Sequence, residues 1–160
     1  MMGNRRLLLV CLLIALEATS LAGHLIGSQN DLDKNDDGFV KLVSFAECVY
    51  NRISNDLFFS KILSNADATK QVVEGLLFRC DFEMSRTVCR KKDHVGNLRD
   101  CELQPEGPLR QTFKCHIEVW ERLWLQDTRI QNFHCQDEIN PDDKESFPDG
   151  AAPSSCRFLR

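Results

Sequence analysis

The sequence predicts an α+β domain in which one helix precedes a set of strands, and two kinds of periodicity carry this prediction. Apolar side chains recur with the 3.6-residue period of a helix from residue 38 to residue 53. Within residues 71–84, apolar and charged residues alternate with the two-residue period of a half-buried strand. Two more candidate strands follow at 110–120 and 125–135. Because the helix precedes all the strands, the order is typical of α+β domains.

Composition and charge limit the functions open to the chain. Its 160 residues are the length of about one domain, and 20 basic against 24 acidic residues give a net charge of −4. This balance lacks the basic footprint of nucleic-acid binders, so we expect no nucleic-acid partner. With 42% hydrophobic residues the chain can build a core.

The first 22 residues have the pattern of a secretory signal peptide. Arg5 and Arg6 precede an apolar run at 7–16, and small residues end this region at Ala22. The run is too short to cross a membrane, since a transmembrane helix needs about 20 residues. We therefore expect residues 1–22 to be removed, the protein to be secreted into the extracellular space, and no membrane partner.

The number of cysteines is consistent with secretion. Removal of Cys11 with the signal peptide leaves seven of the eight cysteines. An oxidising compartment favours disulfides, and an odd number implies one free thiol or a bond to another chain. The remaining cysteines are Cys48, Cys80, Cys89, Cys101, Cys115, Cys135 and Cys156.

The elements are expected in the following order. Residues 23–37 are polar after a short apolar start and predict an extended arm and a loop. The helix follows, and Ser54, Asn55 and Asp56 are typical of its exit. Its apolar face consists of Phe39, Leu42, Val43, Ala46, Val49, Tyr50 and Ile53.

In the strand region, Cys80 alternates with Phe78 and Phe82 and should therefore face the core. Gly75 interrupts an apolar run, which suggests a bulge or the close approach of another backbone. Residues 90–101 predict a loop. The segment 136–160 is rich in acids and punctuated by prolines, so it predicts a mobile acidic tail after the domain at 23–135.

One motif connects these elements to a known family. Gln71, Val72, Val73, Glu74 and Gly75 form the pattern Q-x-V-x-G. Together with the helix and the order and spacing of four later cysteines, this pattern resembles the secreted (type 2) cystatins, which inhibit papain-like cysteine proteases. The resemblance covers residues 25–135.

The resemblance implies a cystatin-like fold, with one long helix packed on a twisted antiparallel sheet of four to five strands. It implies the bonds Cys89–Cys101 and Cys115–Cys135. It also implies a non-enzymatic, reversible inhibitor without cofactor or metal, which blocks the cleft of papain-like proteases such as cathepsins. The blocking wedge combines an N-terminal arm with two hairpin loops and offers no scissile bond in register.

The residues of the wedge can be matched one by one. The arm corresponds to Leu25, Ile26 and Gly27, and the first loop to residues 71–75. The second loop has Leu123 and Trp124 where the family has Pro-Trp. Loss of the proline loosens this loop before binding, while Trp124 can still supply an apolar anchor. Glu74, Glu121 and Arg122 add charge near the loops.

Two other functions remain open. A cystatin fold can have a non-inhibitory extracellular role. In addition, Ser54, Asn55 and Asp56 resemble the loop by which some cystatins inhibit legumain, an asparagine-specific protease, with Asn55 in the specificity pocket. The alternative for this tripeptide is an ordinary polar helix exit.

A partial calcium-loop pattern begins at Asp33: Asp33, Asn35 and Asp37 occupy loop positions 1, 3 and 5, and Gly38 occupies position 6. Position 12 is Ser44 instead of the bidentate Glu that such loops need, so the acids are better explained by the start of the helix.

Three cysteines lie outside the implied bonds. Cys48 should be exposed on the helix, whereas Cys80 should be buried, which argues against a bond between them. Cys156 can reach Cys48, or it can link a second molecule into a dimer; otherwise we expect a monomer. No nucleophile signature surrounds any cysteine, and the four histidines lie in loop-like or strand-end contexts, so we expect no enzyme.

Overall fold

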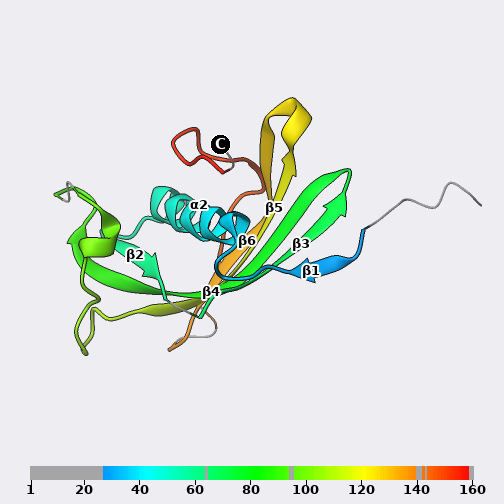
Figure 1. The fold of residues 1–160 in the computed structure, drawn as a ribbon. Coiled ribbons are helices and arrows are strands. Elements are labelled where there is room, and N and C mark those ends of the chain that lie inside the picture. Colours follow the sequence, from blue (N-terminus) through cyan, green and yellow to red (C-terminus); the bar gives the residue numbers. More distant parts are fainter. Residues whose placement is uncertain (1–26, 64, 94–95, 140–141, 143, 159–160) are drawn as a thin grey trace, which may run out of the picture.

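In the computed structural model, one long helix lies across a broad antiparallel sheet (Figure 1). The structure describes residues 27–63, 65–93, 96–139, 142 and 144–158. The predictions for the signal peptide at 1–22 and for Leu25 and Ile26 fall outside these residues. The elements are β1 (Gln29–Asp31), α2 (Asp37–Ile53), β2 (Phe58–Ile62), β3 (Asp67–Val73), β4 (Gly75–Arg90), β5 (Thr112–Arg122), β6 (Asp127–Asp137), β7 (Lys144–Ser146) and β8 (Gly150–Ala151).

The sheet is wider than the expected four to five strands. Its order is β1-β3-β4-β5-β6-β7, with β2 beside β4 and β8 beside β6. The strands predicted from residues 71–84, 110–120 and 125–135 are present, but β1, β2, β7 and β8 were not predicted. Three of these four are only two or three residues long, too short for an alternating pattern.

The acids before α2 organise its first turn. The Asp36 side chain accepts a hydrogen bond from the Gly38 amide at 2.7 Å and caps the helix. Asp33 accepts another from the Asn35 amide at 2.8 Å. Within the described ranges, no group of three or more His, Cys, Asp and Glu side chains is arranged to hold a metal ion.

The predicted apolar face of α2 packs against the sheet. Val43 and Ile53 are only partly buried, and Phe45, which the predicted face omitted, is fully buried. Burial of this face supplies the main stabilisation of the helix. The core contains Phe39, Leu42, Phe45, Ala46, Val49 and Tyr50 from α2 and Phe78, Cys80, Phe82, Met84, Ile117, Val119, Ile130 and Phe133 from the sheet.

The structure corrects the prediction of a mobile acidic tail. Strands β7 and β8 pair with β6, so the segment 144–158 folds back onto the domain. Phe147 and Phe158 are buried in the core, and the Phe158 ring packs edge-on against Phe45. These anchors were missed because an average over a proline-rich, acidic segment hides single apolar side chains.

The described residues form three disulfides. Cys89–Cys101 and Cys115–Cys135 are the pairs implied by the family resemblance, and the third is Cys48–Cys156. Cys80 is free and buried, as its strand register predicts. Cys48 is half-buried instead of exposed, because the C-terminal segment covers it.

The histidine prediction also needs correction. His116 and His134 lie within β5 and β6, directly opposite each other, and not in loops or at strand ends. Among the helices that the structure describes, none is long and apolar enough to cross a membrane.

Candidate functional site

The β3–β4 turn and the β5–β6 turn lie at one end of the sheet (Figure 1), and Gly27 lies beside the first of them. The Gly27 amide donates a hydrogen bond to the Val72 carbonyl at 2.8 Å, which fixes this glycine beside the first hairpin. The two turns share a shallow groove of about 320 Å³ between Val72 and Trp124. The structure thus brings together the described part of the predicted wedge.

The first hairpin turns sharply at Glu74 and Gly75. Gly75 has φ +123°, a conformation that residues with a side chain rarely adopt. A Cβ atom there would lie 2.5 Å from the Glu121 carbonyl oxygen on β5. The expected close approach of another backbone at this glycine is therefore confirmed.

The tips of both hairpins carry exposed apolar side chains. Val72, Leu123 and Trp124 are 55%, 54% and 63% exposed. Val73 is only half-buried, and the Glu74 side chain points into solvent, so its carboxylate keeps its water. An apolar rim of this kind is a surface that a partner can cover.

The second hairpin closes through a short 3₁₀ turn, Leu123–Leu125, followed by Gln126 in the left-handed region. Leu123 is the first residue of this turn, the position where a proline is well tolerated. Leu123 in place of proline therefore makes the turn less stiff, but the turn can still follow the same backbone path.

Gln71 differs from the other motif residues because its side chain turns towards the arm. Its Nε2 donates to the Gly27 carbonyl at 3.0 Å, and its Oε1 accepts from Arg79 at 3.1 Å. Gln71 is therefore placed to hold the wedge together instead of reaching out from it.

Trp120, beneath the hairpins, was missed as a site component, and the expectation for Glu121 needs correction. Trp120 donates from Nε1 to the Glu74 carbonyl at 3.0 Å, and the Arg122 guanidinium stacks on its ring. Glu121 was expected to add charge at the surface, but it is buried, and burial raises its pKa to about 7. The burial of Glu121 could have been predicted from the sequence, because Glu121 continues the inward-facing alternation of Ile117 and Val119 along β5.

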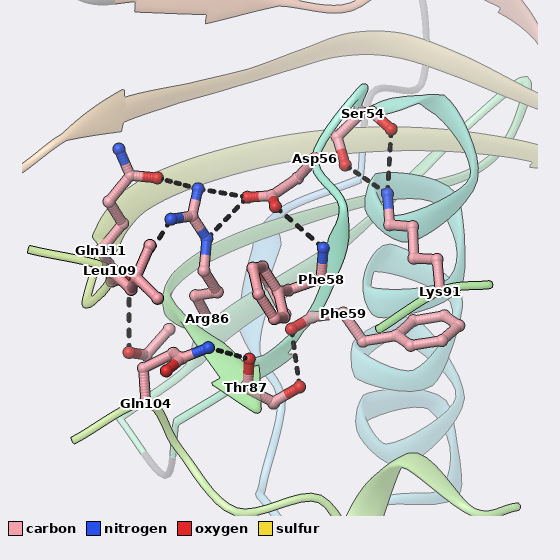
Figure 2. A network of polar contacts seen from close by, with 12 residues as sticks. Ser54, Asp56, Phe58, Phe59, Arg86, Thr87, Lys91, Gln104, Leu109 and Gln111 are labelled. Carbon is pink, nitrogen blue, oxygen red and sulfur yellow. Dashed lines mark hydrogen bonds and ion pairs between the residues drawn. The ribbon is translucent and has the colours of Figure 1, made fainter. Parts of the chain in front are cut away.

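The loop after α2 lies at the end of the sheet away from the two hairpin turns (Figure 1). Figure 2 shows the polar contacts that hold this loop. Asp56 accepts hydrogen bonds from Arg86 at 2.8 and 2.6 Å, and its other oxygen accepts from the Phe58 amide. Lys91 donates to the carbonyl and the hydroxyl of Ser54, both at 2.9 Å. Asn55, between these two fixed residues, is exposed.

Cys80, the free cysteine of the described residues, lies away from these surfaces. Cys80 is buried under α2, and desolvation raises the pKa of its thiol to about 12, which leaves it protonated and inert.

Comparisons with known proteins agree with this arrangement. A sequence model of the cystatin domain matches residues 27–124. Chicken (Gallus gallus) cystatin is 29% identical over 135 residues, which are 79% of this chain and 96% of that protein. Bovine (Bos taurus) cystatin-C is 32% identical over 115 residues, covering 72% of this chain and 76% of that protein.

A solved structure gives the same result. Dimeric human cystatin F matches with a TM-score of 0.59 and 31% identity, over 70% of this chain and 88% of that chain. The domain match spans more than half of the sequence and includes Gly27 and both hairpins. The chain therefore belongs to the cystatin family of cysteine protease inhibitors.

Proposed function

We propose that the protein is a secreted, reversible inhibitor of papain-like cysteine proteases, cathepsins among them, and that it blocks their active-site cleft with a three-part wedge. The observation that carries this proposal is the exposed apolar rim of Val72, Leu123 and Trp124 at the end of the sheet where Gly27 also lies. Leu25 and Ile26 precede Gly27 and complete the arm.

The physical basis is the burial of a preformed apolar edge. The backbones of both hairpins are held by strand pairing, so little ordering entropy is lost when a protease covers them. Trp124 supplies the large anchor typical of interface hot spots. Binding through such contacts is non-covalent, one to one and independent of any cofactor.

Secretion is supported by two features. The first 22 residues have the pattern of a signal peptide, and three disulfides link six cysteines of the described chain. Disulfides of this number are typical of oxidising compartments.

The test is a titration of papain and of a lysosomal cathepsin with the oxidised mature protein, beginning at Gly23. We expect stoichiometric loss of protease activity at nanomolar concentrations. Trp124→Ala should weaken inhibition by about thirtyfold or more, the effect of losing a hot-spot anchor. Leu109→Ala is the matched control, since Leu109 is also about half exposed but lies in a loop remote from the wedge.

The titration also separates the inhibitor from a scaffold without that activity. A folded wild-type protein that leaves both proteases active at micromolar concentration would contradict the proposal and favour a non-inhibitory extracellular role. Circular dichroism on the same sample establishes that the fold is intact.

A second candidate function is inhibition of legumain by the loop after α2. The observation that favours this function is that Asn55 is exposed while both of its neighbours are fixed. Lys91 holds the backbone carbonyl of Ser54, and Arg86 holds the carboxylate of Asp56 (Figure 2). A rigid loop of this kind can occupy a cleft without rearranging. Asn55→Ala should abolish legumain inhibition and leave papain inhibition unchanged; equal loss of both would contradict this role.

A further inference from the structure

We propose that Arg79 is a positioning residue for protease inhibition: acting through the Gln71 amide, it fixes the point at which the N-terminal arm leaves the sheet. This inference rests on the function proposed above. Arg79 lies outside the Q-x-V-x-G motif, on β4, and its guanidinium faces the arm side of the sheet.

The register of the sheet places these groups together. Gln71 on β3 pairs with Leu77 on β4, so Arg79 is its diagonal neighbour on the same face. Gln71 also lies opposite Gln29 on β1. One guanidinium nitrogen of Arg79 donates to Oε1 of Gln71 at 3.1 Å and to Oε1 of Gln29 at 3.3 Å.

The direction of these hydrogen bonds orients the Gln71 amide. A guanidinium can only donate, so the oxygen of the amide must face Arg79. The NH₂ group then faces the Gly27 carbonyl, to which it donates at 3.0 Å. Arg79 thereby selects the one amide orientation that can bind the arm.

Gly27 is held on both sides of its Cα atom. Its amide donates to the Val72 carbonyl at 2.8 Å, and its own carbonyl accepts from Gln71. A Cβ atom at this residue would lie 3.0 Å from both Cβ and the carbonyl oxygen of Val72. The glycine therefore permits close packing of the arm against the first hairpin, and the two hydrogen bonds set its direction.

Arg79 is itself anchored from β5. Its Nε lies 3.4 Å from Oε1 of Glu118, and both side chains are about three-quarters buried. Glu118 also lies 3.4 Å from Nε2 of His116, which contacts Asp81 through its other ring nitrogen. The guanidinium thus connects β5 with β3 and β1, so the arm is braced against the centre of the sheet.

The consequence concerns the entropy of binding. An arm whose exit is already fixed loses less conformational freedom when a protease covers it. Removal of Arg79 leaves the Gln71 amide free to rotate, and the Gly27 carbonyl then loses a defined donor. Weaker inhibition should follow from a looser arm, while both hairpins stay intact.

The test compares Arg79→Met, which keeps the alkyl stem, with Lys114→Met in the full mature chain. Lys114 is an exposed base on β5 that pairs with Glu138 away from the wedge, so it is the matched control. In Arg79→Met, the weakened hydrogen bond from Gln71 to the Gly27 carbonyl should let the adjacent bond from the Gly27 amide to Val72 open more often. Hydrogen exchange of the Gly27 amide should therefore accelerate on the order of fivefold, the factor that corresponds to about one ordinary hydrogen bond. The dissociation constant for papain should rise by a similar factor, and Lys114→Met should change neither.

A double variant establishes the route. If Arg79 acts through Gln71, adding Arg79→Met to Gln71→Met should cause no further loss of inhibition and no further increase in Gly27 exchange. Arg79→Lys should retain part of the wild-type inhibition. Unchanged Gly27 exchange, an additive double variant, or faster exchange with unaltered inhibition would each overturn the inference. Exchange is measured without protease, so a wild type that fails to inhibit papain would refute the proposed function separately.

Discussion

The indole nitrogen of Trp120 on β5 donates a hydrogen bond to the backbone carbonyl of Glu74, at the tip of the β3–β4 hairpin, over 3.0 Å. Trp120 also lies close to the second hairpin, because β5 leads directly into that turn. One side chain therefore ties the tip of the first loop to the base of the second. The two hairpins of the wedge behave as one unit as a result.

Trp120→Phe should loosen this connection and keep most of the ring packing. We expect inhibition of papain to weaken by about two- to tenfold, the range of a single partly exposed hydrogen bond. Stability against urea should change by at most about 1 kcal/mol, since the Glu74 carbonyl can bind water instead. An unchanged inhibition constant would mean that the first hairpin does not depend on Trp120.

Gly75→Ala should be more damaging, because the new methyl group meets the Glu121 carbonyl and cannot be accommodated unless β4 and β5 separate. We expect loss of inhibition by at least about tenfold and a fall in the free energy of unfolding near the upper end of about 1–3 kcal/mol. Both quantities are accessible from papain titration and urea denaturation.

Gly107→Ala is the control for this substitution. Gly107 also has a positive φ of 151°, but a Cβ atom there meets no atom within 4 Å. The control variant carries the backbone strain without the collision, so it should inhibit papain like the wild type. Equal loss of inhibition in both variants would show that strain alone explains the effect at Gly75.

The periodic elements were predictable from sequence, and β2 shows where that approach ends. Strand β2 contains two adjacent phenylalanines and the buried Ser60, so no alternation marks it. Ser60 is buried because Asn51 of α2 binds both its amide and its carbonyl, at 2.8 and 2.7 Å. A partner nine residues away in another element decides this strand, and local periodicity does not record such partners.

The site shows the same division. Val72, Leu123 and Trp124 were predicted because they match the two loops of the cystatin family. Arg79 and Trp120 were missed, since their roles arise from neighbours on other strands. The register of a sheet determines such contacts, and the sequence alone does not state which residues pair.

Glu121 makes the stability of the domain depend on pH. The residue is 5% exposed, and one of its carboxylate oxygens has no hydrogen-bond partner among the described residues. Burial raises its pKa from an ordinary 4.5 to about 7, although the charge of Lys41 opposes the rise. The folded protein therefore binds a proton that the unfolded chain has released between about pH 4.5 and pH 7.

Protonation of Glu121 therefore contributes to the stability of the folded state. This contribution is fully present below about pH 4.5 and is lost as the pH rises to about 7. Glu121→Gln should remove this dependence, so wild type and variant should diverge by at most about 1.4 kcal/mol per pH unit over that interval. Urea denaturation across the pH range measures the difference. Glu106→Gln, at an exposed carboxylate, should run parallel to wild type; a parallel Glu121→Gln curve would contradict the prediction.

The pairing of the cysteines leads us to expect that the protein does not form disulfide-linked dimers. Cys156 is bonded to Cys48 within the chain, and Cys80 is the free cysteine of the described residues, with its thiol buried and its pKa raised to about 12. A thiol reagent should detect one group per mature chain in denaturant and essentially none in the folded protein. A dimer band on a non-reducing gel would contradict this prediction.

The Cys48–Cys156 bond fastens the C-terminal segment to α2 across a sequence separation of 108 residues. The paired Ser variant should lose about 2–4 kcal/mol of stability, since the unfolded chain gains the freedom of a long loop. Phe158→Ala should cost about 3–5 kcal/mol when the bond is present, because its ring packs against Phe45 and Phe78. Without the bond, the segment can detach, and the same substitution should cost much less. Urea denaturation of the four proteins tests this coupling, and additive losses would mean that the segment stays packed without its disulfide.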